Sequence, residues 1–178
     1  MSSRSDAQAD NLLHDPLTGL LSRAAVLEAL NRALSLADRL QHPVTVLFLT
    51  LDDAQRWQKL PPAEANTLEQ ALATRLGARI RIHDVLGRWA TGQYLAVLPD
   101  ADVPSALVLA QDLQSLLPLP GRGDLTISIG VHGRMPSARA SLYGLAGEMV
   151  VAAQRAVETT LNEGPGRLVV EPAPADMA

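Results

Sequence analysis

The sequence predicts an α/β sandwich in which one mainly antiparallel sheet carries packed helices. Segments with helical periodicity alternate with β-rich runs, in the order helix, strand, helix, hairpin, helix, strand, helix, strand. An apolar run, VTVLFLTL at 44–51, is typical of a buried central strand. Hydrophobic residues form 47% of the 178 residues and charged residues 19%, which indicates a globular chain with a substantial core.

The first half of the chain contains two predicted helices around this strand. The first helix covers residues 22–41, with Ser22 as its N-cap and Pro43 just beyond its end. The residues on its helical period are Leu27, Leu30, Leu34, Leu36 and Ala37. Consecutive prolines open the second helix, near 62–78, because proline is well tolerated in a first helical turn.

A predicted hairpin, a third helix and a further strand follow. The hairpin strands are expected at 85–90 and 94–98, joined by a turn at 90–93. Pro104 begins the third helix, whose inward positions are Leu107, Ala110, Leu113 and Leu117. The run LTISIGV at 125–131 has the β-forming composition of a strand.

The last part of the chain is expected to form a fourth helix at 141–162 and a short final strand, RLVVE. The segment GPG separates the two, because glycine and proline end helices. We expect one domain over residues 12–171, a flexible N-terminal segment at 1–11 and a flexible tail at 172–178.

Composition argues against several classes of function. The net charge is −4, no basic run stands out, and aromatic residues are only 3%, so nucleic acid is not an expected partner. There are no cysteines, which fits a reducing compartment. The N-terminus lacks the apolar core of a signal peptide, and the longest apolar run is far too short to span a bilayer. We therefore expect a cytoplasmic domain without a membrane segment.

General motif searches identify no reaction. Glycine-rich phosphate loops are absent. The Asp52-Asp53 pair after strand 44–51 is either a magnesium site or an ordinary strand end that starts a helix. Ser128 and Ser141 have no nucleophile context. The histidines are scattered and are expected to be surface or structural residues: His14, His42, His83 and His132.

Several segments, in order, resemble one family. DPLTGLLSR at 15–23 is similar to the opening signature of the diguanylate cyclase, or GGDEF, domain. VLFLTLDDAQRW at 46–57 resembles its first strand and metal-binding turn. RIHDVLGRWATGQYLAVLPDAD at 81–102 resembles its signature hairpin, and LTISIGV its later strand. The resemblance covers roughly residues 12–170.

This resemblance implies both a fold and a chemistry. The fold is a five-stranded, mainly antiparallel sheet with a ferredoxin-like βαββαβ core flanked by helices, related to nucleotide cyclases. In active members two GTP-loaded domains meet, and each 3′-hydroxyl attacks the α-phosphate of the other GTP to give cyclic di-GMP. Magnesium ions held by carboxylates offset the phosphate charge in that reaction.

The signature of the family matches poorly in this chain. Gly-Gly-Asp/Glu-Glu-Phe falls on Ala90, Thr91, Gly92, Gln93 and Tyr94. Side chains thus replace the paired glycines, which normally let the backbone approach the nucleotide. Neither Gly92 nor Gln93, at the two acidic positions, can hold a cation or accept a proton.

The other positions of the implied site have changed as well. The metal aspartate on the strand corresponds to Thr50, while Asp52 keeps an acidic position that is not the usual ligand. Gln55 replaces a phosphate lysine, Gln58 a guanine-reading asparagine and Gln154 a second phosphate lysine. An arginine usually follows the last of these positions, where the alignment meets an insertion. We therefore expect no catalytic residues, no metal, no cofactor and no cyclase activity.

A regulatory site is the remaining candidate for a ligand. Arg81-Ile82-His83-Asp84 has the spacing of the Arg-x-x-Asp motif with which family members bind cyclic di-GMP. Arginine can bind a phosphate through two parallel hydrogen bonds. The alternative is that Arg81 and Asp84 end a helix and pair on the surface. The usual second arginine of the motif corresponds to Asp112, which would repel a phosphate.

Three hypotheses of function follow from these residues. The leading one is a catalytically inactive GGDEF-type domain that acts as a regulatory or protein-interaction module in bacterial cyclic di-GMP signalling. Its expected partner is another signalling domain or protein, or a second copy in a homodimer. The second is a sensor that binds cyclic di-GMP or GTP without turnover, and the third is an active cyclase. Trp57 is expected to be partly exposed as a candidate interface residue, and Trp89 to pack internally.

Overall fold

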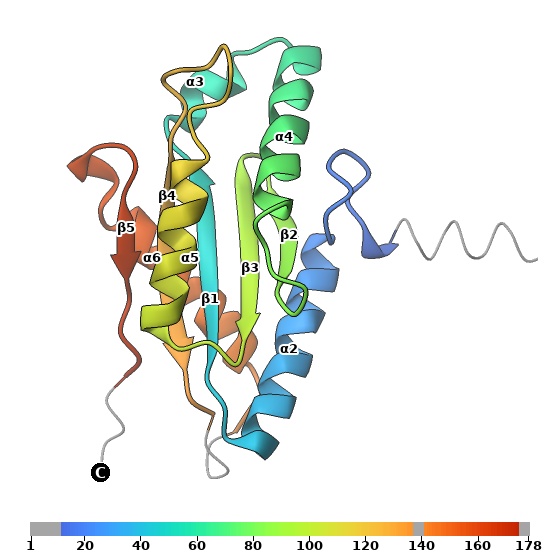
Figure 1. Ribbon diagram of the computed structural model, residues 1–178, viewed down its shortest axis with the longest axis vertical. Helices are drawn as coiled ribbons and strands as arrows, with labels where there is room; N and C mark the ends of the chain where they lie inside the picture. Colours follow the sequence, from blue (N-terminus) through green and yellow to red (C-terminus); the bar gives the residue numbers. More distant parts are fainter. Residues whose placement is uncertain (1–11, 137–140, 175–178) are drawn as a thin grey trace, which may run out of the picture.

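The computed structural model describes residues 12–136 and 141–174. The predicted N-terminal segment 1–11 lies outside these residues, as does the part of the predicted tail at 175–178. A five-stranded sheet with helices on both faces confirms the predicted fold class (Figure 1).

The strands lie in the order β2-β3-β1-β4-β5. All neighbouring pairs are antiparallel except β4 and β5, which are parallel. The first four strands with their connecting helices form the ferredoxin-like core that the resemblance implies. The strands are β1 (Val44–Leu51), β2 (Val85–Ala90), β3 (Gln93–Pro99), β4 (Ile127–Arg134) and β5 (Leu168–Val170).

Strand β1 is the buried centre of the sheet, as its uninterrupted apolar sequence predicts. Successive side chains of a strand point to opposite faces. Leu47, Leu49 and Leu51 pack with helices α4 and α5, whereas Val46 and Phe48 pack with helices α2 and α6. Burial on both faces explains why β1 shows no alternation between polar and apolar residues.

Helices cover the two faces in pairs. The side chain of Ser22 caps α2 by accepting a hydrogen bond from the Ala25 amide, as expected for this residue type. Asp102 caps α5 in the same way through Ser105. The helices are α2 (Arg23–Leu40), α3 (Ala54–Gln58), α4 (Pro62–Gly77), α5 (Val103–Ser115) and α6 (Leu145–Glu158).

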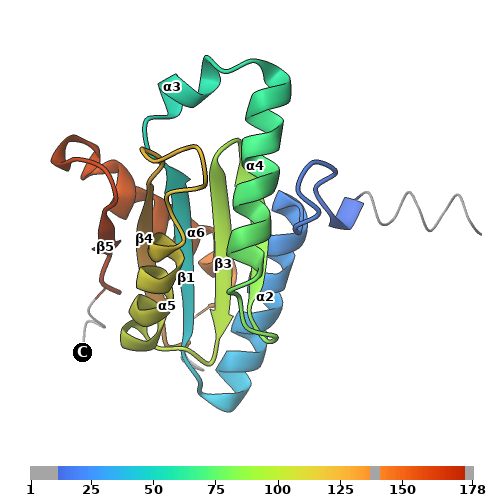
Figure 2. The ribbon, with the colours of Figure 1, turned by 45° about the horizontal axis from the view of Figure 1, so that its top comes forward.

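Three details differ from the sequence predictions. The fourth helix is shorter than expected, because Gly144 in the left-handed region precedes Leu145 and the helix ends at Glu158. The strand predicted at 125–131 begins two residues later as β4 and extends to Arg134. The short α3, at the end of the sheet between β1 and α4, is absent from the predicted order of elements, where a helix start after Asp52-Asp53 was only one of two alternatives (Figure 2). Five residues are too few to show helical periodicity.

A close contact between α6 and β4 brings the C-terminal end of α6 near the end of β1. Gly130 lies directly under α6, where an added Cβ would stand 1.8 Å from the Ala153 carbonyl oxygen. Only glycine permits this approach. Among the described residues, no helix combines the length and apolar character needed to cross a bilayer.

Candidate functional site

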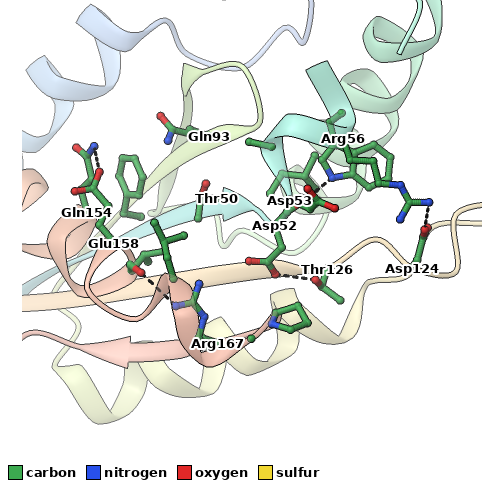
Figure 3. Close-up of a pocket in the computed structure, with 18 residues that line it drawn as sticks. Thr50, Asp52, Asp53, Arg56, Gln93, Asp124, Thr126, Gln154, Glu158 and Arg167 are labelled. Atoms are coloured by element: carbon green, nitrogen blue, oxygen red, sulfur yellow. Dashed lines mark hydrogen bonds and ion pairs between the residues drawn. The ribbon is translucent and has the colours of Figure 1, made fainter. Parts of the chain in front are cut away.

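A pocket of about 640 Å³ opens beside the end of β1. Its walls come from β1, β3, α3, the segment 124–126, α6 and the segment 161–167 (Figure 3). The chain thus brings together residues more than a hundred positions apart. Thr50 and Gln93, two residues of the site that the family resemblance implies, are among those that line the pocket.

Two positions at which the family resemblance implies carboxylates lie side by side in this pocket. Thr50 and Gln93 are direct partners across the antiparallel β1–β3 pair, and both line the pocket. A hydroxyl and a neutral amide therefore occupy neighbouring positions on adjacent strands (Figure 3). Such groups carry no charge to neutralise a magnesium ion or a triphosphate.

The signature hairpin turns through Thr91 and Gly92, while Ala90 and Gln93 pair across the hairpin. Gly92 has a φ of +67°, in the left-handed region that favours glycine. An added Cβ there would also stand 3.2 Å from the Leu51 side chain. The remaining glycine is therefore required by the turn itself.

A buried carboxylate that the sequence analysis did not identify holds this turn in place. Glu69 on α4 accepts hydrogen bonds from the Gly92 amide at 2.5 Å and the Arg88 Nε at 2.7 Å. The Tyr94 hydroxyl lies 3.3 Å from the same carboxylate. Arg88 also pairs with Asp15 at 3.2 Å, and Asp15 accepts hydrogen bonds from Thr18. The helical spacing of Glu69 with Leu72 and Leu76 could have shown that it faces inward.

The acid–base properties of this network match its contacts. Burial alone would raise the pKa of Asp15, but hydrogen bonds from Thr18 and the neighbouring Arg88 lower it overall. Burial similarly opposes the charge of Arg88, yet Glu69 and Asp15 raise the pKa of Arg88. Burial and the charge of Glu69 raise the pKa of Tyr94. Asp15 and Arg88 are therefore held in their charged forms, and the Tyr94 hydroxyl stays protonated.

Asp52, the acid that the sequence retains, is fully engaged by the protein itself. Its carboxylate accepts hydrogen bonds from the Thr126 hydroxyl at 2.7 Å and the Ser128 hydroxyl at 2.6 Å. It also accepts the Gly166 amide at 2.8 Å. The β1–β4 register explains this arrangement, since Thr50 lies opposite Ser128 and the Asp52 amide bonds Thr126. Asp53 occupies the N-cap position of α3 without a side-chain capping bond, which supports the helix-start alternative.

The charges in the pocket are predominantly negative. Its lining contains four carboxylates and two guanidinium groups. Arg56 pairs with Asp124, and Arg167 donates to the Val157 carbonyl at 3.4 Å. Arg167 lies after the insertion that interrupts the alignment, so its place in the pocket was not predictable from sequence. No group of three or more potential metal-ligating side chains occurs among residues 12–136 and 141–174.

The three glutamines of the implied site are dispersed. Gln154 on α6 lines the pocket and donates to Glu158 at 2.8 Å. Gln58 lines an adjoining small cavity of about 60 Å³ next to the signature turn, which shares Thr50 and Gln93 with the pocket. Gln55 is exposed and lines neither cavity. The structure therefore joins Thr50, Gln93 and Gln154 in one pocket and leaves Gln55 outside it.

The candidate cyclic di-GMP residues lie in the turn between α4 and β2, away from this pocket. Helix α4 ends at Gly77, so Arg81 and Asp84 do not end a helix, and that part of the alternative to a ligand site is wrong. Instead the Asp84 amide donates to the Arg81 carbonyl at 3.0 Å. Burial raises the pKa of Asp84, although Arg81 and His83 oppose this effect. Asp112 forms an ion pair with Arg79 at 3.6 Å.

The aromatic residues and histidines have structural contacts. Trp57 is only 7% exposed and donates to the Asp52 carbonyl at 2.6 Å, so the expectation of partial exposure is wrong. Trp89 packs edge-on against Phe48 at 6.4 Å, as expected. His132 is buried and bonds the Glu171 carbonyl at 2.8 Å. His14 and His42 contact Gly19 and Asp100, respectively, and His83 is exposed.

Solved structures of similar shape agree with this fold. The GGDEF domain of FimX from Pseudomonas aeruginosa shares 22% identity at a TM-score of 0.76, over 88% of this chain and 98% of that one. The coiled coil and GGDEF domain of DgcB from Caulobacter crescentus, in complex with c-di-GMP, shares 16% at 0.81, over 94% and 90%. The diguanylate cyclase SiaD from P. aeruginosa, with its activator SiaC, shares 20% at 0.76, over 96% and 66%.

A family comparison covers most of the chain. Residues 12–158 match the model of the family described as diguanylate cyclase, GGDEF domain. This range includes the signature hairpin, the β1 turn and most of the pocket. The chain therefore belongs to the GGDEF domain family of diguanylate cyclases.

Proposed function

We propose that this chain is a non-catalytic GGDEF domain that acts as a regulatory or protein-interaction module in bacterial cyclic di-GMP signalling. The observation that carries the proposal is the neutral pair Thr50–Gln93 in the pocket. A triphosphate needs cations close by, and the carboxylates that would hold a metal ion are missing from these two strands.

The remaining charges support the same conclusion. Asp52 already accepts three hydrogen bonds from the protein, and the lining has more carboxylates than guanidinium groups. A metal-free triphosphate would therefore meet net repulsion. The family scaffold is nevertheless intact, which favours a role in binding another protein. The neighbour SiaD, solved with its activator, illustrates such an assembly for a GGDEF protein.

A turnover assay tests this proposal. The full chain is incubated with GTP and either Mg²⁺ or Mn²⁺, and the products are separated by chromatography, with an active GGDEF domain as positive control. We expect no cyclic di-GMP above the enzyme-free blank. Calorimetric titration with GTP and Mg²⁺ should likewise show no saturable binding. Turnover by the unmodified chain would refute the proposal.

A second candidate function is a cyclic di-GMP sensor at Arg81 and Asp84. The ion pair between Arg79 and Asp112 favours it. Asp112 by itself would repel a phosphate of the ligand, and Arg79 offsets that negative charge. Arg81 is exposed and lies in the same turn. Arg79, Arg81 and Asp84 therefore place two guanidinium groups and one carboxylate, the groups that bind phosphate and guanine, within six residues of the chain. The neighbour DgcB, solved with c-di-GMP, provides a precedent within the fold.

Calorimetric titration with cyclic di-GMP distinguishes the sensor from the simple interaction module. Arg81→Ala should weaken binding by about 1.5–3 kcal/mol, the usual range for hydrogen bonds to charged groups. Arg32→Ala, on the exposed surface of α2, is the matched control and should bind like the unmodified chain. Absence of binding at high ligand excess, or equal binding by all three proteins, would remove the case for this site.

A further inference from the structure

The segment that joins α6 to β5, residues 159–167, forms one wall of the pocket; we refer to it as the strap. Leu161, Gly164, Pro165 and Arg167 of the strap line the pocket. Its short 3-10 helix, Leu161–Glu163, contains no buried residue. Apolar packing therefore contributes little to holding the strap in place.

Hydrogen bonds hold the strap instead, and the Arg167 carbonyl accepts from the Ile129 amide at 2.7 Å and from Gln114 Nε2 at 3.0 Å. The Gly166 amide donates to Asp52 Oδ2 at 2.8 Å. The Arg167 amide donates to the Ser128 Oγ at 3.0 Å, and Ser128 in turn donates to Asp52 Oδ1 at 2.6 Å. Asp52 therefore holds the Gly166 amide directly and the Arg167 amide through Ser128, whereas the Arg167 carbonyl is bound separately to β4 and α5.

Other features of the strap favour movement. Gly164 and Gly166 have φ values of 107° and 70°, and glycine changes such angles without a steric penalty. The buried Nε of Arg167 has no hydrogen-bond partner among the described residues, and its Nη1 contact to Val157 is long at 3.4 Å. An unpaired buried donor disfavours the closed position. Before the anchored Arg167 carbonyl, the strap thus depends on the hydrogen bonds that Asp52 makes directly to Gly166 and, through Ser128, to the Arg167 amide.

We infer that the strap is a lid on the pocket and that Asp52 is its latch. The acid that the sequence retains in the family's metal-binding turn serves here to close the site. The inference rests on the proposed function, because an Asp52 engaged by the strap is not available to a metal ion. A ligand that extends past Arg167 would have to open the strap, so access to the pocket is regulated by these hydrogen bonds.

Amide hydrogen exchange, followed by NMR on the full chain, tests the latch. Asp52→Asn removes the charge and one acceptor while keeping the shape of the side chain. We expect exchange at Gly166 and Arg167 to become roughly 10- to 100-fold faster, as loss of a hydrogen bond to a charged group implies. Ser128→Ala should accelerate exchange at Arg167 more than at Gly166. Asp53→Asn is the matched control and should leave both amides unchanged, since the Asp53 side chain forms no hydrogen bond with the strap among the described residues.

Two outcomes would overturn the inference. One is unchanged exchange at both strap amides in Asp52→Asn, and the other is equal acceleration in Asp53→Asn. Amides in the middle of β1, such as that of Leu47, report global unfolding, and acceleration there matching that of the strap would also count against a local lid. GTP turnover is measured separately: all the variants should stay inactive, because Thr50 and Gln93 are unchanged. Turnover would refute the proposed function and leave the exchange result on the strap standing.

Discussion

Replacing the buried carboxylate of Glu69 should destabilise the fold far more than replacing an exposed one. The Glu69 side chain is 6% exposed, and its partner Arg88 is 20% exposed. In Glu69→Gln, one side-chain oxygen becomes an NH₂ group, which cannot accept the hydrogen bonds of Arg88 or Gly92. One of these buried donors then loses its acceptor, and the charge of Arg88 loses one of its two partners.

The magnitude follows from the geometry of the network. Breaking a buried ion pair by removing one partner costs about 3–5 kcal/mol. Arg88 keeps Asp15 at 3.2 Å and some contact with solvent, so we expect the lower end, about 3 kcal/mol. Urea unfolding followed by circular dichroism measures this loss as a lower midpoint at unchanged slope.

The matched control is Glu64→Gln on the same helix. Glu64 pairs with Arg122, but its side chain is 46% exposed, so the expected loss is at most about 1 kcal/mol. A double-mutant cycle with Arg88→Met isolates the coupling between Glu69 and Arg88. A loss in Glu69→Gln no larger than in Glu64→Gln, or a coupling near zero, would refute the reasoning about the network.

Three further predictions concern pH and packing. Burial lowers the pKa of His132, so the unfolded chain binds a proton at this residue more readily than the folded chain. The stability of the fold should therefore fall as the pH drops below about 6.5. His132→Gln should reduce this fall in urea titrations between pH 7.5 and 5.5. The lowered pKa of Asp15 means that its ionised form stabilises the fold above about pH 4, and this stabilisation is lost at lower pH. Asp15→Asn should therefore destabilise the chain at pH 7 but not at pH 2–3. Equal losses of stability at both pH values would contradict this assignment. Gly130→Ala should lower the free energy of unfolding, measured in urea, by at least about 3 kcal/mol, because the added methyl group meets the Ala153 carbonyl. Gly147→Ala, with open space around it, should instead stabilise α6 by about 0.5–1 kcal/mol. Similar effects of the two changes would show that the close approach of α6 to Gly130 does not restrict this position to glycine.

Local sequence patterns predicted most of the secondary structure. The apolar run at 44–51 corresponds to β1 over its full length, and the hairpin turns where it was expected. The apolar run and the hairpin turn can both be predicted well, because each depends on residues that are consecutive in the sequence. The ends of α6 and β4 were predicted less well, since helix and strand ends depend on caps and neighbouring strands that are distant in sequence.

The candidate site was predicted only in part. The missing carboxylates at Thr50 and Gln93 are visible in the sequence once the family resemblance is recognised. Glu69 could have been assigned to the inward face of α4, but its partner Arg88 lies 19 positions away on another element. Arg167 lies beyond an insertion, where alignment provides no register. Glu69 and Arg88 meet only because α4 packs against the face of the sheet that carries Tyr94.

The sequence by itself determined the order of the elements, the buried central strand and the neutral residues at the positions where the resemblance implies acids. Folding cannot restore a carboxylate that the chain does not contain, so the absence of acids at Thr50 and Gln93 holds in any conformation. Only the tertiary structure decided the role of Asp52. Its partners Thr126, Ser128 and Gly166 lie 74, 76 and 114 positions away, and the antiparallel β1–β4 register brings the first two to its carboxylate. If β1 and β4 paired in another register, the hydroxyls of Thr126 and Ser128 would not reach the Asp52 carboxylate, because a hydrogen bond requires contact within about 3 Å and correct alignment.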